Sequence, residues 1–399
     1  MDAGFHDFGS RVLPEDRMDE LCGLLLASVP RSDQRRWGEL YVRGLLHAEG
    51  RKTIKGIAAA ADSAAMQSLQ QFISTSPWEW QPVRQSLARH MEREIQPGAW
   101  IVEPLTVLKT GEHSVGVERQ YVTGLGRIAN CQQSSSTWLA SEETSCPVDW
   151  QLALPDRWVA SGEQRRRAAI PDHVRSRTPV QCALDSVVAM TEDWRLPPRP
   201  VVMSVAASDV HEVSTVLTGR RIPFVLRIDG SVPVVEASGG GRVFPAARLI
   251  EAMREQAGAV EWRDLGGLRR RTTRVAGCRV GVPTATDPAG RPARVRPHHL
   301  VGAWTDPAAG RPTEFWLSNL GHLSAAALFR IANLARRVSR DLYEVCDRVG
   351  ARDFSGRTFR GWHHHATLVS IAHAISVLAR KDRRLGAPRP PVRSLVGAR

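Results

Sequence analysis

The sequence predicts an α/β fold with an all-α N-terminal domain, then a segment of strands and helices, a β-rich stretch and final helices. Apolar residues recur at helical spacing up to about residue 95. Short apolar, β-branched runs typical of strands follow between residues 100 and 206, and we expect three of these strands near 115–122, 126–133 and 136–140. Residues 216–320 are irregular and rich in β-branched residues, glycine and proline. A chain of 399 residues is long enough for two or three packed units.

Changes in pattern and composition divide the chain into five parts. We expect a helical domain (1–96), a first part of the core (97–215), a β-rich insertion (216–320), the final helices of the core (321–382) and a basic Pro/Arg-rich tail (383–399). Pro97-Gly98 marks the first boundary, because this dipeptide type favours a turn.

The N-terminal domain is expected to contain five helices. Two short ones meet near Asp62 and Ser63, which suggests a helix-turn-helix-like arrangement. Gln67 and Gln70 on the second could read adenine, although helical packing explains them equally well. The domain also contributes candidate phosphate contacts: Arg35, Arg36, Arg43, Lys52 and Lys55.

Positive charge is concentrated in the second half of the chain. Residues 1–215 contain 23 Lys+Arg and 27 Asp+Glu, whereas residues 216–399 contain 31 and 14, with Lys381 the only lysine. Arginine binds phosphate in a bidentate manner, so this surplus indicates nucleic acid as a partner. The alternative is the arginine codon preference of a GC-rich genome, which would not explain the asymmetry between the halves.

Cysteines and hydropathy indicate a cytoplasmic protein. The six cysteines are scattered without a Cys-x-x-Cys pair, which favours buried thiols over disulfides or a zinc site. We find no apolar run of about 18 residues and no signal-peptide pattern at the N-terminus. We therefore expect no membrane association, and a nucleoid-associated location if DNA is the partner.

Three motifs are similar to those of a known family. They are Lys109-Thr110-Gly111-Glu112-His113-Ser114-Val115-Gly116-Val117-Glu118-Arg119-Gln120-Tyr121, then Gly126-Arg127-Ile128-Ala129-Asn130-Cys131-Gln132, and the stretch from Gly350 to His363-His364-His365. They resemble DDE transposases of bacterial insertion sequences, in particular the insertion-sequence-701 family. The resemblance covers roughly residues 31–380 and implies an RNase H-like core interrupted by a β-rich insertion, acting on double-stranded DNA.

The resemblance also places the family's three catalytic carboxylates on this sequence. Their positions are occupied by Glu103, Ser204 and Ser339. The accessory tyrosine, arginine and lysine positions of the family hold Ala332, Ala335 and Cys346. The scaffold motifs are thus retained while the reactive residues are replaced.

DNA cleavage by such a site needs two magnesium ions about 4 Å apart, held by carboxylates. Serine hydroxyls supply no charge. Nearby acids lie two to eight residues along the chain (Asp209, Glu212, Asp341, Glu344), and on a helix, shifts of two and five residues turn a side chain by about 200° and 140°. We therefore expect an inactive triad with no cofactor, and magnesium only if the ligands have been relocated.

Further DNA contacts are expected in the core and the second half of the chain. The candidates are Arg119, Arg269, Arg270, Arg271, Arg357, Arg360 and His363. The three consecutive histidines cannot converge on one metal ion, because successive helical residues point in different directions. They are expected to contact phosphate or to pack under the core.

The sequence thus predicts a catalytically inactive, transposase-derived protein that binds specific double-stranded DNA sequences, for example in transcriptional regulation, with a homodimer left open. Two alternatives remain. One is an active DDE transposase with relocated metal ligands, and the other is an interaction subunit that does not bind DNA.

Overall fold

The computed structural model describes residues 13–122, 125–236, 242–263, 270–286, 292–306 and 310–386. The predicted DNA contact Arg269 and residues 387–399 of the predicted tail lie outside the described residues. Within the described ranges, none of the helices is long and apolar enough to cross a bilayer.

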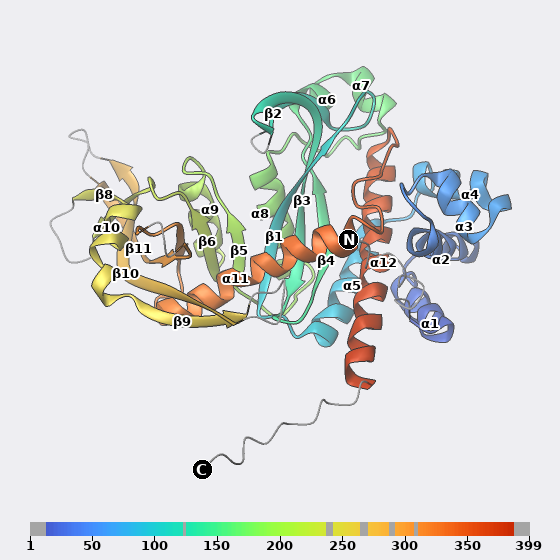
Figure 1. The fold of residues 1–399 in the computed structure, drawn as a ribbon. Helices are drawn as coiled ribbons and strands as arrows, with labels where there is room; N and C mark the ends of the chain where they lie inside the picture. The colour runs from blue at the N-terminus through green and yellow to red at the C-terminus, as the bar shows by residue number, and fades with distance from the viewer. Residues whose placement is uncertain are drawn as a thin grey trace, which may run out of the picture.

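The N-terminal part is helical, as predicted. Its helices are α1 (Glu15–Leu25), α2 (Ser32–His47), α3 (Ile54–Ala61), α4 (Met66–Ser74) and α5 (Trp80–Ile95). Thr53 caps α3 by accepting a hydrogen bond from the Gly56 amide, and Asp62 caps the 3-10 turn Ser63–Ala65 before α4 by accepting one from the Ala64 amide. Helices α2, α3 and α4 pack against one another (Figure 1).

The first half of the sheet is antiparallel. Its strands are β1 (Ala99–Leu108), β2 (Val117–Val122), β3 (Arg127–Ala140) and β4 (Ser145–Leu152). The long strand β3 pairs with β1 on one side and with both β2 and β4 on the other. The sequence predicted two strands at 126–133 and 136–140, but they form one continuous strand, and the third antiparallel partner is β4, which was not predicted.

The second half begins with two parallel strands beside β1. These are β5 (Val201–Ser204) and β6 (Phe224–Ile228), preceded by α8 (Pro179–Glu192) and α9 (Val210–Gly219). The short helices α6 (Asp156–Ala160) and α7 (Gly162–Arg167) lie between β4 and α8. An antiparallel set on β1 followed by parallel strands and a final helix is the arrangement expected from the resemblance.

The β-rich insertion continues the same sheet instead of forming a separate one. It comprises β7 (Pro233–Glu236), β8 (Val243–Pro245), α10 (Ala246–Ala252), β9 (Gly258–Arg263), β10 (Arg270–Thr286), β11 (Pro292–Trp304) and β12 (Glu314–Ser318). Strand β12 pairs with the core strand β6, so the order runs β2-β3-β1-β5-β6-β12-β11-β10-β7-β8. The predicted boundary at residue 216 falls inside α9, and the insertion strands begin only after β6.

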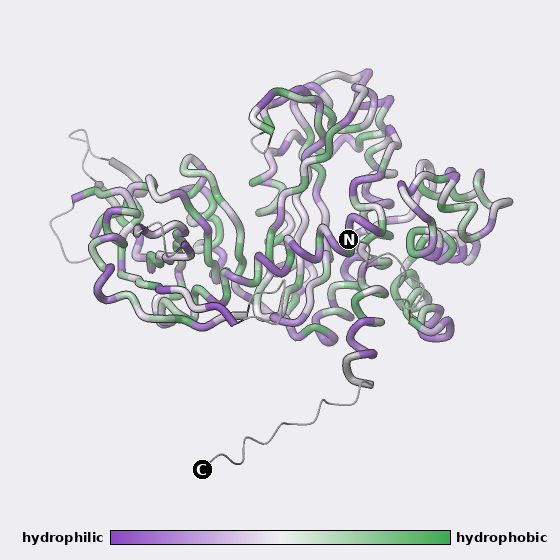
Figure 2. Tube along the Cα trace, in the orientation of Figure 1, coloured by the Kyte–Doolittle hydropathy of each residue, from purple (hydrophilic) through white to green (hydrophobic). Residues whose placement is uncertain are grey.

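Two long helices complete the chain. Helix α11 (Ala325–Asp341) crosses the sheet over β1, β3 and β10, and continues into a π-helical turn, Leu342–Cys346 (Figure 1). Hydrophilic residues recur along α11, as expected for a helix with one face in solvent (Figure 2). Helix α12 (Phe359–Gly386) is different, because every residue from 361 to 379 is buried.

From residue 361 to residue 379, helix α12 is buried on all sides because it lies between the N-terminal helices and the sheet. It packs against α2, α4 and α5 on one side and against β4 on the other (Figure 1). Tyr41 of α2 is hydrogen-bonded to His365, with 2.9 Å between Oη and Nδ1. The predicted units 1–96 and 321–382 therefore share one hydrophobic core.

A buried arginine joins the three elements at this core. Arg84 of α5 is fully buried, and its Nη1 donates to Asp149 of β4 at 2.8 Å. Its Nε donates to Thr367 of α12 at 2.8 Å, and Nη2 donates to the His363 carbonyl at 3.1 Å. A buried charge is tolerated only when it is paired and fully hydrogen-bonded, and Arg84 meets this condition.

We expect Arg84→Leu to lower the free energy of unfolding by about 3–5 kcal/mol, because it leaves the carboxylate of Asp149 buried without its charged partner. Urea unfolding at neutral pH measures the change. Arg177→Ala is the matched control: its ion pair with Asp185 is exposed (47% and 58%), and its loss should change stability by less than about 1 kcal/mol. Equal effects of the two substitutions would contradict the role given to Arg84.

Candidate catalytic site

The structure brings the three predicted triad positions into one pocket. Glu103 lies on β1, Ser204 ends β5 and Ser339 lies on α11; all three line a pocket of about 160 Å³. Trp100 and Ile101 pair with Val201 and Val202, and continuing this parallel register brings Glu103 level with Ser204. Since the carboxyl ends of parallel strands meet at one edge of a sheet, this is where a ligand site is expected.

Glu103 is the one triad position that retains an acid. Its Oε1 accepts a hydrogen bond from Ser339 Oγ at 3.4 Å, and the same hydroxyl lies 3.2 Å from the Ala335 carbonyl. Burial raises the pKa of Glu103 to about 7, while the bond from Ser339 acts in the opposite direction. At neutral pH this carboxyl is therefore partly protonated.

A second carboxylate reaches the pocket from the insertion, and sequence reasoning missed it. Glu314 at the start of β12 lies between two arginines, 3.2 Å from Arg227 and 2.8 Å from Arg336. Its side chain is 11% exposed, and both arginines also line the pocket. No local motif marks Glu314, because its place depends on the pairing of β12 with β6.

Two of the four acids that could have replaced the triad are engaged elsewhere. Asp341 is buried and accepts hydrogen bonds from the amide and hydroxyl of Ser145, while Glu344 pairs with Arg340 at 2.8 Å. None of the four proposed substitutes lines the pocket. In the described part of the chain, no group of three or more His, Cys, Asp and Glu side chains is arranged to hold a metal ion.

This donor set does not fit a pair of magnesium ions. Hard divalent cations need several charged oxygen ligands. The pocket offers one carboxyl without an arginine partner, Glu103, and a second, Glu314, which is neutralised by Arg227 and Arg336. Two guanidinium groups beside the site also repel a cation, so we derive no metal-dependent step from these residues.

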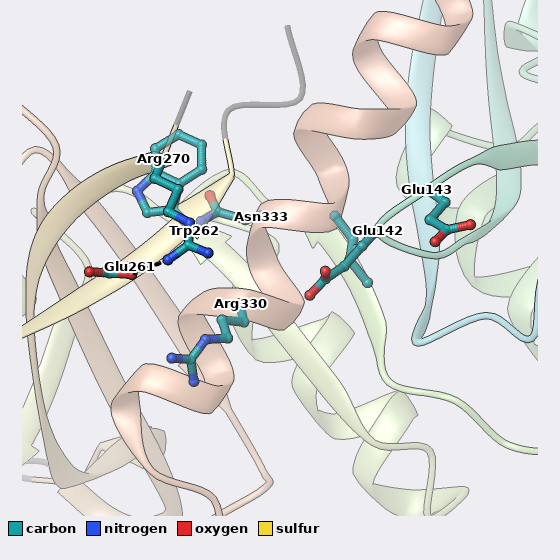
Figure 3. A pocket seen from close by; sticks show the side chains of 8 residues that line it. Glu142, Glu143, Glu261, Trp262, Arg270, Arg330 and Asn333 are labelled. Carbon is teal, nitrogen blue, oxygen red and sulfur yellow. Dashed lines mark ion pairs between the residues drawn. The ribbon is translucent and has the colours of Figure 1, made fainter. Parts of the chain in front are cut away.

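A larger pocket of about 290 Å³ lies next to the candidate site (Figure 3). Asn333 of α11 lines both pockets, and its Nδ2 is buried without a hydrogen-bond partner. The predicted DNA contact Arg270 lies in this second pocket, 3.6 Å from Glu261 and beside Trp262. Figure 3 shows Glu142 and Glu143 on the opposite side of the pocket from Trp262 and Arg270.

The predicted DNA contacts of the N-terminal unit fall into two groups. Arg36, Lys55, Gln67 and Gln70 are exposed. Three others are engaged within the fold: Arg35 donates to the Val29 and Pro30 carbonyls, Arg43 pairs with Glu15, Asp19 and Glu39, and the ammonium of the buried Lys52 donates to the Ala48 carbonyl.

A pocket of about 330 Å³ brings together residues that lie far apart in the sequence. Lys52, Gln70 of α4 and Arg357 of the turn before α12 all line it. Arg119 on β2, Arg271 on β10 and Arg357 are exposed, and Arg360 is partly buried. Arg119 and Arg271 do not line this pocket, and their strands β2 and β10 are not neighbours in the sheet.

The three histidines are packed inside the core. His363 is 2% exposed and stacks on Trp80 with 4.4 Å between ring centroids, and His364 stacks on Trp78 at 3.8 Å. Burial lowers the pKa of all three, to about 4 for His364 and His365. His363 is therefore not placed to contact DNA, and this prediction is corrected, because α12 is enclosed on every side.

We expect Glu103→Gln to change how stability depends on pH. A pKa raised from 4.5 to about 7 means that the folded chain retains a proton that the unfolded chain loses. The wild-type free energy of unfolding should therefore fall between about pH 4.5 and pH 7, with an upper limit of about 1.4 kcal/mol per pH unit.

The glutamine variant lacks this titration, so relative to wild type it should gain roughly 1–3 kcal/mol between pH 5 and pH 8. Urea unfolding at both pH values measures the gain, and the pH 5 comparison serves as the control. An identical pH dependence of the two proteins would show that Glu103 is charged in the folded chain.

Comparison with known proteins gives one match. The model of a family described as DDE superfamily endonuclease matches residues 24–247, more than half of the 399 residues. The match includes Glu103 and Ser204 and ends before Glu314 and Ser339. No curated protein matches the chain.

Proposed function

The chain belongs to the DDE superfamily endonuclease family, and we propose from this premise that it binds double-stranded DNA without cutting it. Within the family, the motifs at 109–121, 126–132 and 350–365 favour descent from an insertion-sequence-701 transposase. We propose that the cleavage site has lost its metal ions and that DNA recognition has been retained for regulating transcription.

The observation that carries this proposal is the environment of Glu103. A nuclease site of this kind needs charged carboxylates around two cations. Here Glu103 is hydrogen-bonded to Ser339, and the other acid, Glu314, is paired with Arg227 and Arg336. These contacts leave the pocket without the negative charge that two cations need.

The same arginines support continued contact with DNA. Arg227 and Arg336 are 54% and 42% exposed, so their guanidinium groups can reach a phosphate while remaining paired with Glu314. Residues 216–399 contain 31 basic and 14 acidic residues, which favours a polyanionic partner. A site without metal ions lacks their attraction for DNA phosphate. The two arginines supply positive charge in place of the ions.

For sequence recognition, we propose the exposed face of α4 and its surroundings. Gln67 and Gln70 are exposed there, and glutamine can form two hydrogen bonds with adenine in the major groove. Lys55 of α3, which packs against α4, and Arg357, which lines a pocket with Gln70, are exposed, so both can contact phosphate. Half-sites related by two-fold symmetry in the bound sequences would indicate a homodimer.

The first test is retention of host genomic fragments by the purified chain in EDTA at roughly physiological salt, where nonspecific phosphate contacts are weakened. We expect a small number of peaks that share a motif. The double variant Gln67→Ala, Gln70→Ala should relax this motif, because it removes contacts to base edges.

Gln81→Ala is the matched control, since Gln81 is exposed on the neighbouring helix α5. It should leave the motif unchanged. Uniform retention of all fragments by the wild type would contradict sequence-specific recognition, and salt-insensitive binding to one protein partner would favour the alternative of an interaction subunit.

The second test addresses cleavage. With Mg²⁺ or Mn²⁺, we expect the wild type to leave supercoiled DNA intact, and its melting temperature to be unchanged by either ion. The triple variant Glu103→Asp, Ser204→Asp, Ser339→Glu supplies three carboxylates in the same pocket, so either ion should raise its melting temperature. Metal-dependent nicking by the wild type would support the active transposase instead.

A further inference from the structure

A separate pocket lies at the opposite end of β6 from the candidate catalytic site. It has a volume of about 540 Å³, and its lining consists of Thr218, Arg221, Pro223, Arg296, Pro297, His298, Asn319 and Leu320. Pro223 precedes β6, whereas Arg227 of the catalytic pocket lies four residues further along, about 13 Å away at the usual rise of a strand. The two pockets are therefore distinct.

Two buried polar atoms of this pocket have no hydrogen-bond partner. They are Thr218 Oγ1 and His298 Nε2, and His298 is 5% exposed. A buried polar atom without a partner costs about 1–3 kcal/mol, so such atoms are uncommon unless a ligand or water satisfies them. Both atoms belong to residues that line the same pocket, but neither atom is exposed to solvent, so a ligand in the pocket reaches them only after a rotation of the side chain.

The charge of the pocket is positive. Of the described residues that line it, Arg221 and Arg296 are basic and none is acidic. Among the described residues, the guanidinium groups of Arg221 and Arg296 have no hydrogen-bond or ion-pair partner. The adjacent Arg220 differs, because its Nε lies 3.3 Å from Glu192. Two arginines without an acidic partner give a concave site a positive potential, which favours the binding of an anion.

Arg221 also has an unfavourable backbone conformation. Its φ is +56°, in the left-handed region, at the C-terminal end of α9 where glycine or asparagine is usual. A side chain in this region costs about 1–2 kcal/mol. Glycine would therefore be more stable at position 221, and the arginine side chain needs another explanation than backbone geometry.

We propose that this pocket binds a phosphate group. The guanidinium groups of Arg221 and Arg296 and the hydroxyl of Thr218 donate hydrogen bonds to its oxygens. Nδ1 of His298 lies 3.0 Å from the Arg296 carbonyl, which can only accept, so Nδ1 carries a hydrogen. A hydrogen bond between Nε2 and a phosphate oxygen then requires one proton, which is carried either by Nε2 or by the phosphate oxygen.

The wall of the pocket is already fixed without a ligand. Asn319 accepts a hydrogen bond from the Phe224 amide at 2.9 Å and donates one to the Ile222 carbonyl at 3.0 Å. These bonds hold the end of β12 against the start of β6. The volume exceeds that of a phosphate ion, which leaves room for the group that the phosphate is attached to. This inference does not depend on the proposed DNA-binding function.

The test compares arginine variants in titrations with inorganic phosphate, using calorimetry at an ionic strength held constant with chloride. We expect saturable binding of phosphate by the wild type. Arg221→Gly and Arg296→Gln should each lower the affinity by about tenfold or more, since each removes charge-assisted hydrogen bonds. Arg221→Gly should melt no lower than the wild type, because it relieves the backbone strain. Arg220→Ala is the control and should bind as the wild type does.

A second arm distinguishes free phosphate from the DNA backbone. If the pocket holds a backbone phosphate, Arg221→Gly should lower the slope of log K against log salt for duplex binding by about 1, while Arg220→Ala leaves it unchanged. An effect of Arg221→Gly in either arm supports the site. Identical behaviour of Arg221→Gly and Arg220→Ala in both arms would overturn it.

Discussion

The buried guanidinium of Arg84 is the interaction on which the rest of the structure depends. It joins α5, β4 and α12 through Asp149, Thr367 and the His363 carbonyl. A charge taken out of water is stable only while all these partners stay in place, so the three elements are held in one fixed arrangement. The N-terminal helices are therefore part of the core and not a separate appendage.

The candidate site depends on the same arrangement through the turn that precedes α12. The Nε2 of His365 donates to the Gly350 carbonyl at 2.8 Å, and Tyr41 donates to its Nδ1. Gly350 has a φ of +94° and follows the π-helical turn at the end of α11. The hydrogen bonds of His365 thus help to hold α11, and with it Ser339, in its position next to Glu103. Glu103, Ser204 and Ser339 therefore share a pocket whose shape depends on contacts outside it.

The sequence predicted the helices of the N-terminal unit and the triad positions because these depend on local patterns. Helical spacing and caps are set by neighbouring residues, and Glu103, Ser204 and Ser339 follow from motifs at fixed spacing, which the fold brings into one pocket. Glu314 could not be predicted in this way. Its neighbours Arg227 and Arg336 reach it only through the pairing of β12 with β6 and the packing of α11.

The errors in the strands and histidines have similar causes. Ser134, Ser135 and Ser136 interrupt the apolar pattern of β3, although all three are buried, so one strand resembled two. Strand β4 contains Pro147 and Asp149, residue types that favour loops. Asp149 is tolerated there because Arg84 pairs with it. His363 resembled a surface residue because burial of α12 on all sides follows from packing between distant segments.

The burial of α12 has a consequence for synthesis of the chain on the ribosome. Tyr41 and His365 are 324 residues apart, so at about 5–20 residues per second α2 waits on the order of 15–60 s for its partner. During that time Trp78 and Trp80, which are 1% and 7% exposed in the folded chain, lack the histidine rings that cover them. The nascent N-terminal helices therefore present an aromatic surface of the kind that chaperones bind, and the fold closes only when the last helix emerges.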